Sequence, residues 1–126
     1  MNETTLVMST LSKTWIFDLD GTLVFHNAYK TGEDKWLPGA KELLQSISED
    51  DYILILTARE IEAKEQTERF LKESRIRYNN ILYQMPMGER ILFNDNKISG
   101  LRMAHIVECN RNEGLRKVKI IINPEL

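Results

Sequence analysis

Two aspartates separated by one residue stand at the end of an apolar stretch, in WIFDLDGTLV at residues 15–24. Asp18 and Asp20 follow a short apolar run that is typical of a buried strand and stops at Gly21. Two close carboxylates repel each other unless a cation neutralises them or one of them stays protonated. Oxygen-only clusters of this kind suit Mg²⁺, which prefers carboxylates, waters and a substrate phosphate. The structural alternative is a turn in which the aspartates cap a helix or bind backbone groups.

Polar residues also follow two further apolar stretches. Thr57 lies at the end of YILILTA (52–58), where its hydroxyl and the free N–H groups of a following helix would bind an anion. An ordinary N-cap threonine is the alternative, and the two readings are compatible because an N-cap presents the same donors. Asn94 and Asp95 end RILFND (90–95), and Asp95 adds a third carboxylate.

The elements that must position these residues are strands alternating with helices. Helical spacing follows Pro38, with apolar residues at i, i+3, i+4 and i+7, and a second helix is expected over about 59–75. The tail is expected to form a short helix and then a final extended piece. Such βαβ units give a parallel sheet, and ligands bind outside the carboxyl ends of its strands. Strands are expected at 14–20, 52–58, 79–84, 90–95 and 103–108.

Composition sets the broad class. A chain of 126 residues with 42% hydrophobic and 29% charged residues suits one domain, 1–126, with one core. The net charge of −2 provides no global basic field, which argues against nucleic acid as a partner. No apolar run approaches the roughly 20 residues of a membrane span. The polar N-terminal lead, 1–12, does not resemble a secretory signal.

The single cysteine, Cys109, excludes a disulfide framework and a cysteine-based zinc site. One thiol in a chain of this size fits a reducing compartment, so a cytoplasmic location is expected. We interpret Cys109 as a small buried apolar residue.

Three of these motifs resemble those of the haloacid dehalogenase-like (HAD) phosphohydrolase superfamily. FDLDGTLV (17–24) is similar to its first motif, ILILTAR (53–59) looks like the second, and ILFND (91–95) resembles the acidic fourth motif. The resemblance covers roughly residues 13–97 in the right order. It implies an α/β fold, a Rossmann-like three-layer sandwich with a central, mainly parallel sheet, and Mg²⁺-dependent phosphoryl transfer.

The resemblance also implies roles for individual residues. Asp18 would attack phosphorus and form an aspartyl-phosphate. Asp20 would protonate the leaving oxygen and then deprotonate the water that hydrolyses the intermediate. Mg²⁺ would be held by Asp18, the backbone carbonyl of Asp20, and Asp95. Thr57 and the N–H of Ala58 would hold phosphate oxygens.

One family feature is missing, the cation that offsets the carboxylates. Many relatives place a lysine in a KP pair after the third strand, where this chain has Met85 before Pro86. Arg90 is the nearest cation and the preferred substitute, with Lys97 or no cation as the alternatives. Arg59 would either reach the phosphate or lie on a charged helix surface.

Three further residues would support the site. Gly21 would permit a tight turn beside the metal, and Thr22 would fix that loop. Asn94 replaces one of two acids in the fourth motif, so it could orient a metal-bound water but would contribute no charge.

The chain has no room for a cap domain and offers only a flap-like loop at 25–36. An open site would admit large substrates, or a second subunit of a homo-oligomer would cover it. The candidates for contacts with the leaving group, which have a surface loop as their alternative reading, are His26, Asn27, Tyr29, Lys30 and Trp36.

The sequence therefore predicts a Mg²⁺-dependent phosphomonoester hydrolase acting on a phosphorylated small molecule, such as a sugar phosphate. One alternative is a phosphatase of a polymeric substrate, either a phosphoprotein or a nucleic-acid end. The other is a non-catalytic binding module with the same fold. The missing lysine favours the binding module, whereas the joint presence of Asp18, Asp20, Thr57 and Asp95 favours catalysis.

Overall fold

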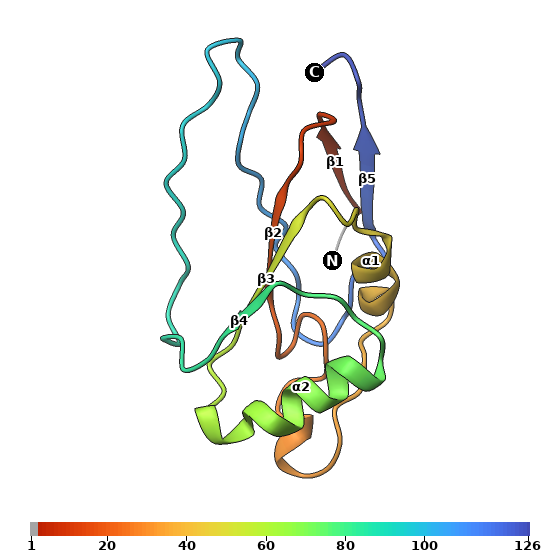
Figure 1. Cartoon of the computed structure of the whole chain (residues 1–126), viewed down its shortest axis with the longest axis vertical. Coiled ribbons are helices and arrows are strands. Elements are labelled where there is room, and N and C mark those ends of the chain that lie inside the picture. The colour runs from red at the N-terminus through yellow and green to blue at the C-terminus, as the bar shows by residue number, and fades with distance from the viewer. Residues whose placement is uncertain (1–2) are drawn as a thin grey trace.

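The chain has a mixed α/β fold whose strands pair in parallel in two open sheets (Figure 1). The computed structural model describes residues 3–126. One sheet has the strand order β2-β3-β4 and the other pairs β1 with β5. In chain order, the elements are β1 (Thr4–Met8), β2 (Thr14–Asp18), η1 (Ala28–Lys30), α1 (Ala40–Ser46), β3 (Tyr52–Leu56), η2 (Ile61–Ala63), α2 (Lys64–Glu73), β4 (Asn80–Leu82) and β5 (Val118–Ile122).

The three-stranded sheet is the part that positions the candidate residues. β2 and β3 run in register from Thr14 opposite Tyr52 to Asp18 opposite Leu56. Their inward side chains are apolar, and Ile53 and Ile55 are fully buried. All three strands point the same way, so their carboxyl ends lie at one edge of the sheet. The predicted strands at 14–20, 52–58 and 79–84 are confirmed, each shorter than expected.

The predicted strands at 90–95 and 103–108 are wrong. Residues 83–110 contain neither helix nor strand, and much of this segment runs away from the rest of the chain (Figure 1). Ile91 is 78% exposed and Phe93 90% exposed. An apolar run becomes a strand only when a neighbouring strand satisfies its backbone, and periodicity alone cannot show whether that partner exists. We call residues 86–108 the arm.

Both predicted helices are confirmed, although they are shorter than expected. α1 buries Ala40 and Leu44, as the helical spacing predicts. α2 buries Thr67 and Leu71 on its inner face and starts at Lys64, after the short 3₁₀ turn η2. Among residues 3–126, no helix is long and apolar enough to cross a bilayer.

The two ends of the chain pair with each other. Residues 4–8 of the predicted N-terminal lead form β1, which sequence reasoning missed, and Thr4 lies opposite Val118 in β5. The predicted final extended piece is confirmed as β5, but residues 115–117 form a bend and a turn instead of a short helix. The partner of β1 lies at the other end of the chain, so no local pattern could reveal the pairing.

Candidate active site

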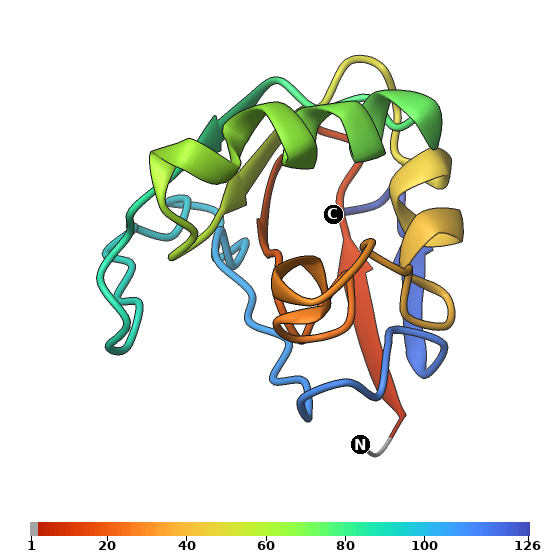
Figure 2. The ribbon, with the colours of Figure 1, turned by 90° about the horizontal axis from the view of Figure 1, so that it is seen from below.

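The edge that carries the candidate site begins where β2 ends, and Figure 2 views the molecule from this side, with the flap and α2 in front. Asp18 is the last residue of β2, and the Leu19 N–H still bonds to the Leu56 carbonyl of β3 at 3.2 Å. Gly21 then turns the chain with a φ of 86°, a conformation that favours glycine, and its N–H bonds to Val24 at 2.7 Å. The predicted glycine turn is therefore present.

Asp18 lies in a half-exposed position and accepts two side-chain hydrogen bonds. The Thr22 hydroxyl donates to Oδ2 at 3.1 Å, and the Arg90 guanidinium donates to Oδ1 at 3.2 Å. The side chains of Arg90 and Asp18 are 40% and 38% exposed. Arg90, the preferred substitute for the family's lysine, thus reaches the predicted nucleophile. Burial, and secondarily the charge of Asp18, raise the pKa of the nearby Cys109 thiol.

Asp20 points to a different partner. Both of its oxygens accept hydrogen bonds from Arg59, with the shortest at 2.9 Å from Nη2 to Oδ1. The Thr57 hydroxyl also donates to Oδ2 at 3.3 Å. The first two sequence motifs are therefore joined by direct contacts, because Thr57 and Arg59 both follow β3.

Arg59 is a buried residue, with only 1% of its side chain exposed. Besides Asp20, it donates from Nη1 to Asp34 at 3.0 Å and to Thr67 at 2.9 Å, and from Nη2 to Asp34 at 2.7 Å. A guanidinium has five N–H donors, and this set of acceptors occupies all of them. The predicted helix-surface position is wrong, and no donor remains for a phosphate.

The charge of Arg59 is held by its neighbours. Burial alone would lower its pKa, but hydrogen bonds to Asp34 and Asp20, and their negative charges, raise it above its ordinary value. The Tyr29 ring also lies over the guanidinium, 3.8 Å from Cζ to the ring centroid, which is a cation–π contact.

Thr57 is 1% exposed and lies beside the chain that leaves β4. Its N–H donates to the Leu82 carbonyl, and its own carbonyl accepts from Met85 N–H at 3.0 Å. Its hydroxyl accepts from the Arg59 N–H at 3.0 Å. The expectation that Thr57 directly precedes a helix is wrong, since Glu60 caps η2, and Ala58 is exposed. Met85 thus reaches the site edge but brings no charge.

Asn94, Asp95 and Lys97 all lie in the exposed arm. The Asn94 amide donates to the adjacent Asp95 carbonyl, and the Lys97 N–H closes a turn with Leu101. In the described part of the chain, no three His, Cys, Asp or Glu side chains are grouped so that they could hold a metal ion. The arrangement of residues 3–126 thus brings Asp18 and Asp20 together with Thr57 and Arg90, and it does not supply the full ligand set predicted for Mg²⁺.

The flap, residues 25–36, is a loop, as predicted, and it also contains the short helix η1. Trp36 anchors one end, because its indole N–H donates to the Ser74 hydroxyl at 2.9 Å and its ring stacks on Phe70. Trp36 therefore anchors the flap against the region of α2.

Sequence reasoning missed three residues at this edge. Asp34 pairs with Arg59, but in the run GEDKW nothing distinguishes it from its charged neighbours. Asn112 donates its N–H to the Gly21 carbonyl and accepts the His26 N–H on its side chain. Arg111 is exposed and lies against Gly21, where an added Cβ would meet its Cγ at 3.1 Å. For Arg111 the sequence shows only a basic residue two positions after Cys109, and this pattern does not indicate a site.

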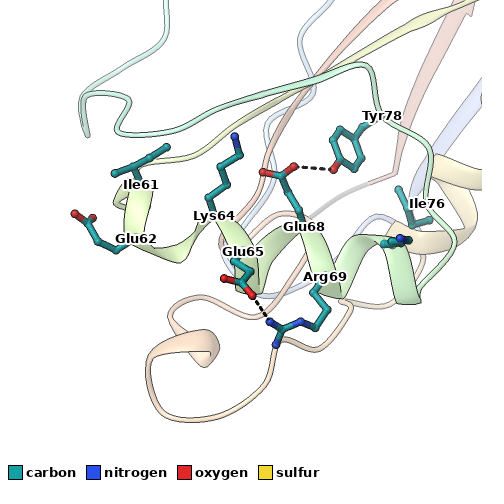
Figure 3. A pocket seen from close by; sticks show the side chains of 9 residues that line it. Ile61, Glu62, Lys64, Glu65, Glu68, Arg69, Ile76 and Tyr78 are labelled. Carbon is teal, nitrogen blue, oxygen red and sulfur yellow. Dashed lines mark hydrogen bonds and ion pairs between the residues drawn. The ribbon is translucent and has the colours of Figure 1, made fainter.

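A surface hollow lies elsewhere, along the outer side of α2 (Figure 3). Its lining mixes acidic and basic side chains, and some of them are paired: Arg69 bonds to Glu65 at 2.9 Å, and Tyr78 donates to Glu68 at 3.4 Å. The nearby Tyr83 hydroxyl also donates to Glu68. Such mixed and paired charges do not favour an anionic ligand, so this hollow is not the candidate site.

A scan against protein-family models finds no match to this chain, and searches of curated proteins and of solved structures also find none.

Proposed function

We propose that this protein is a phosphomonoester hydrolase that works through an aspartyl-phosphate on Asp18, within a Rossmann-like three-layer α/β fold. The observation that carries the proposal is the joining of two motifs at one sheet edge. Asp18 ends β2, the neighbouring parallel strand delivers Thr57, and the Thr57 hydroxyl contacts Asp20. Ligands of parallel α/β sheets bind at this edge.

In the proposed first step, an Asp18 oxygen attacks phosphorus, and the bond from phosphorus to the leaving oxygen breaks. Asp20 gives that oxygen a proton, which yields an alcohol and the aspartyl-phosphate. In the second step Asp20 takes a proton from water, and the resulting hydroxide displaces Asp18 from phosphorus. Arg90 supplies positive charge beside the nucleophile.

Mg²⁺ is part of the proposal as the source of additional positive charge, which would screen the nucleophile from an anionic phosphate. Asp18 is half-exposed at the edge and has oxygen atoms that suit this ion. Asp95 would complete the ligand set only if the arm moved, since no three His, Cys, Asp or Glu side chains are grouped among residues 3–126. The proposed substrate is a phosphorylated small molecule, for which a sugar phosphate is the example.

Hydrolysis of 4-nitrophenyl phosphate tests the proposal. We expect turnover with Mg²⁺, loss of turnover with excess EDTA, and loss of turnover in Asp18→Asn at any Mg²⁺ concentration. Asp50→Asn is the matched control, because Asp50 is exposed and lies between α1 and β3. Full activity in Asp18→Asn would refute the assignment of the nucleophile.

A second candidate function is a non-catalytic binding module. The specific observation that favours it is the arrangement of Asp20, whose two oxygens are both occupied by Arg59. A panel of phosphoesters that includes phosphopeptides and oligonucleotide 5′-phosphates separates the readings. Hydrolysis of the polymers alone would select the polymeric substrates, and no hydrolysis of any member would select the binding module.

A further inference from the structure

The buried contacts of Arg59 connect the turn after β2 to the flap. Its Nη2 donates to Asp20 at 2.9 Å and to Asp34 at 2.7 Å. Asp34 belongs to the flap, and its side chain is 2% exposed. Charge-assisted hydrogen bonds from a planar guanidinium are directional, and they are shielded from water here. The two carboxylates are therefore held at a fixed spacing by one side chain.

We propose that Arg59 is a positioning residue that ties the flap to Asp20, so that the carboxylate of Asp20 keeps one orientation at the sheet edge. The consequence for turnover rests on the proposed function, whereas the tie between Arg59 and the flap does not. In this proposal the flap helps to orient Asp20 and is more than a surface loop.

The other contacts of the flap do not replace this tie. Trp36 bonds to Ser74, which follows α2, and Gln66 on α2 donates to the Tyr29 carbonyl at 3.2 Å from an exposed position. Both contacts attach the flap to the region of α2. The His26 N–H of the flap also bonds to the Asn112 side chain, and the Asn112 N–H bonds to the Gly21 carbonyl. None of these contacts reaches the Asp20 carboxylate. Tyr29 adds to the tie itself, because its ring covers the Arg59 guanidinium.

The geometry also predicts which substitution of Arg59 would break the contact with the flap. Lysine would keep the positive charge at position 59, but its ammonium is a single point with three donors. It could not hold Asp20, Asp34 and Thr67 with the spacing that the guanidinium provides. Arg59→Lys should therefore behave like a loss of the tie, even though the charge is conserved.

Two variants and one control test the proposal. Asp34→Asn removes the negative charge that pairs with Arg59 and keeps the shape of the side chain. Arg59→Lys keeps the positive charge and removes the planar guanidinium. Arg69→Gln is the control, since Arg69 makes an exposed ion pair with Glu65 on α2. The readouts are amide hydrogen exchange of peptides that cover 25–36, and kcat and KM for 4-nitrophenyl phosphate with Mg²⁺.

In both variants we expect exchange in the flap to accelerate about tenfold, while exchange in β3 stays as in the wild type. We expect kcat to fall about tenfold and KM to change less than twofold, because a misplaced Asp20 affects proton transfer more than binding. The control should match the wild type in every readout. If Arg59→Lys does not fold, Asp34→Asn decides.

Three results would overturn the proposal. They are unchanged amide exchange of the flap in Asp34→Asn, faster amide exchange of the flap with unchanged kcat, and a rise in KM at constant kcat. The last result would make the flap a substrate contact instead of a support for Asp20. If the wild-type protein hydrolyses no phosphoester, the proposed function fails, and flap exchange alone then decides whether the tie exists.

Discussion

The contact between Thr67 and Arg59 gives a prediction that separates a hydrogen bond from packing. Thr67 lies on the inner face of α2, is 1% exposed, and its hydroxyl accepts an Nη1–H bond from Arg59 at 2.9 Å. Thr67→Val keeps the shape and removes the acceptor. Thr67→Ser keeps the acceptor and removes a methyl group. The pair therefore asks whether the bond or the packing stabilises this part of the protein.

The expected magnitudes follow from burial. In Thr67→Val a charged N–H is left without its acceptor in a site closed to water, which costs about 1.5–3 kcal/mol. In Thr67→Ser the lost methyl costs about 1 kcal/mol. A change of 1 kcal/mol shifts Tm by about 4 °C for a domain of this length. Thr67→Val should therefore melt about 6–12 °C below the wild type, and Thr67→Ser about 4 °C below it.

Urea unfolding followed by tryptophan fluorescence measures both variants, and thermal melts provide the second readout. An unchanged m-value would show that the shift in the midpoint reports stability. The reasoning would be refuted if Thr67→Val were as stable as the wild type, or if Thr67→Ser were the less stable of the two. Either result would mean that the hydrogen bond from Arg59 Nη1 to the Thr67 hydroxyl does not stabilise the protein.

Three further predictions concern the exposed half of the site and the arm. Arg90→Gln should raise KM for a phosphoester roughly fivefold and leave stability within about 0.5 kcal/mol, since its pair with Asp18 is half-exposed; steady-state kinetics and a thermal melt check this, with Arg69→Gln as the matched control. Gly21→Ala should cost about 1–2 kcal/mol in urea unfolding, because its φ of 86° is strained for any side chain. Phe93→Ser should change the stability of the metal-free protein by less than about 0.5 kcal/mol, since Phe93 is 90% exposed; a larger loss would show that the arm packs against the body.

The parts of the fold that could be predicted from the sequence are those set by local patterns. Asp18 and Thr57 were found because each follows a short apolar run, and a strand that ends in a polar residue places it at the sheet edge. The inner face of α2 was found for the same reason, since helical spacing selects Thr67 and Leu71. In both cases the residues that form the pattern lie within about ten positions of one another in the sequence.

The parts that could not be predicted depend on distant partners. RILFND has the pattern of a strand, but a strand also needs a neighbour, and the arm has none among the described residues. β1 was missed because its neighbour is β5 at the other end of the chain. Arg59 takes neither of the two positions expected for it, at the phosphate or on a helix surface, because only the fold brings Asp34 to it.

The charges at the site edge lead to a last argument about the metal. Two separate ion-paired groups lie at this edge, Asp18 with Arg90 and Arg59 with Asp20 and Asp34, and together they contain three carboxylates and two guanidiniums. With Asp20 protonated, as the proposed first step requires, two negative charges stand against two positive ones, and no net positive charge remains to attract a phosphate dianion. Arg59 is fully engaged, so it cannot turn toward the phosphate. We therefore expect turnover at this edge to need an added cation, so titration with Mg²⁺ should raise kcat/KM from a baseline near zero; activity that is independent of divalent ions would instead assign this charge to an arginine such as Arg111.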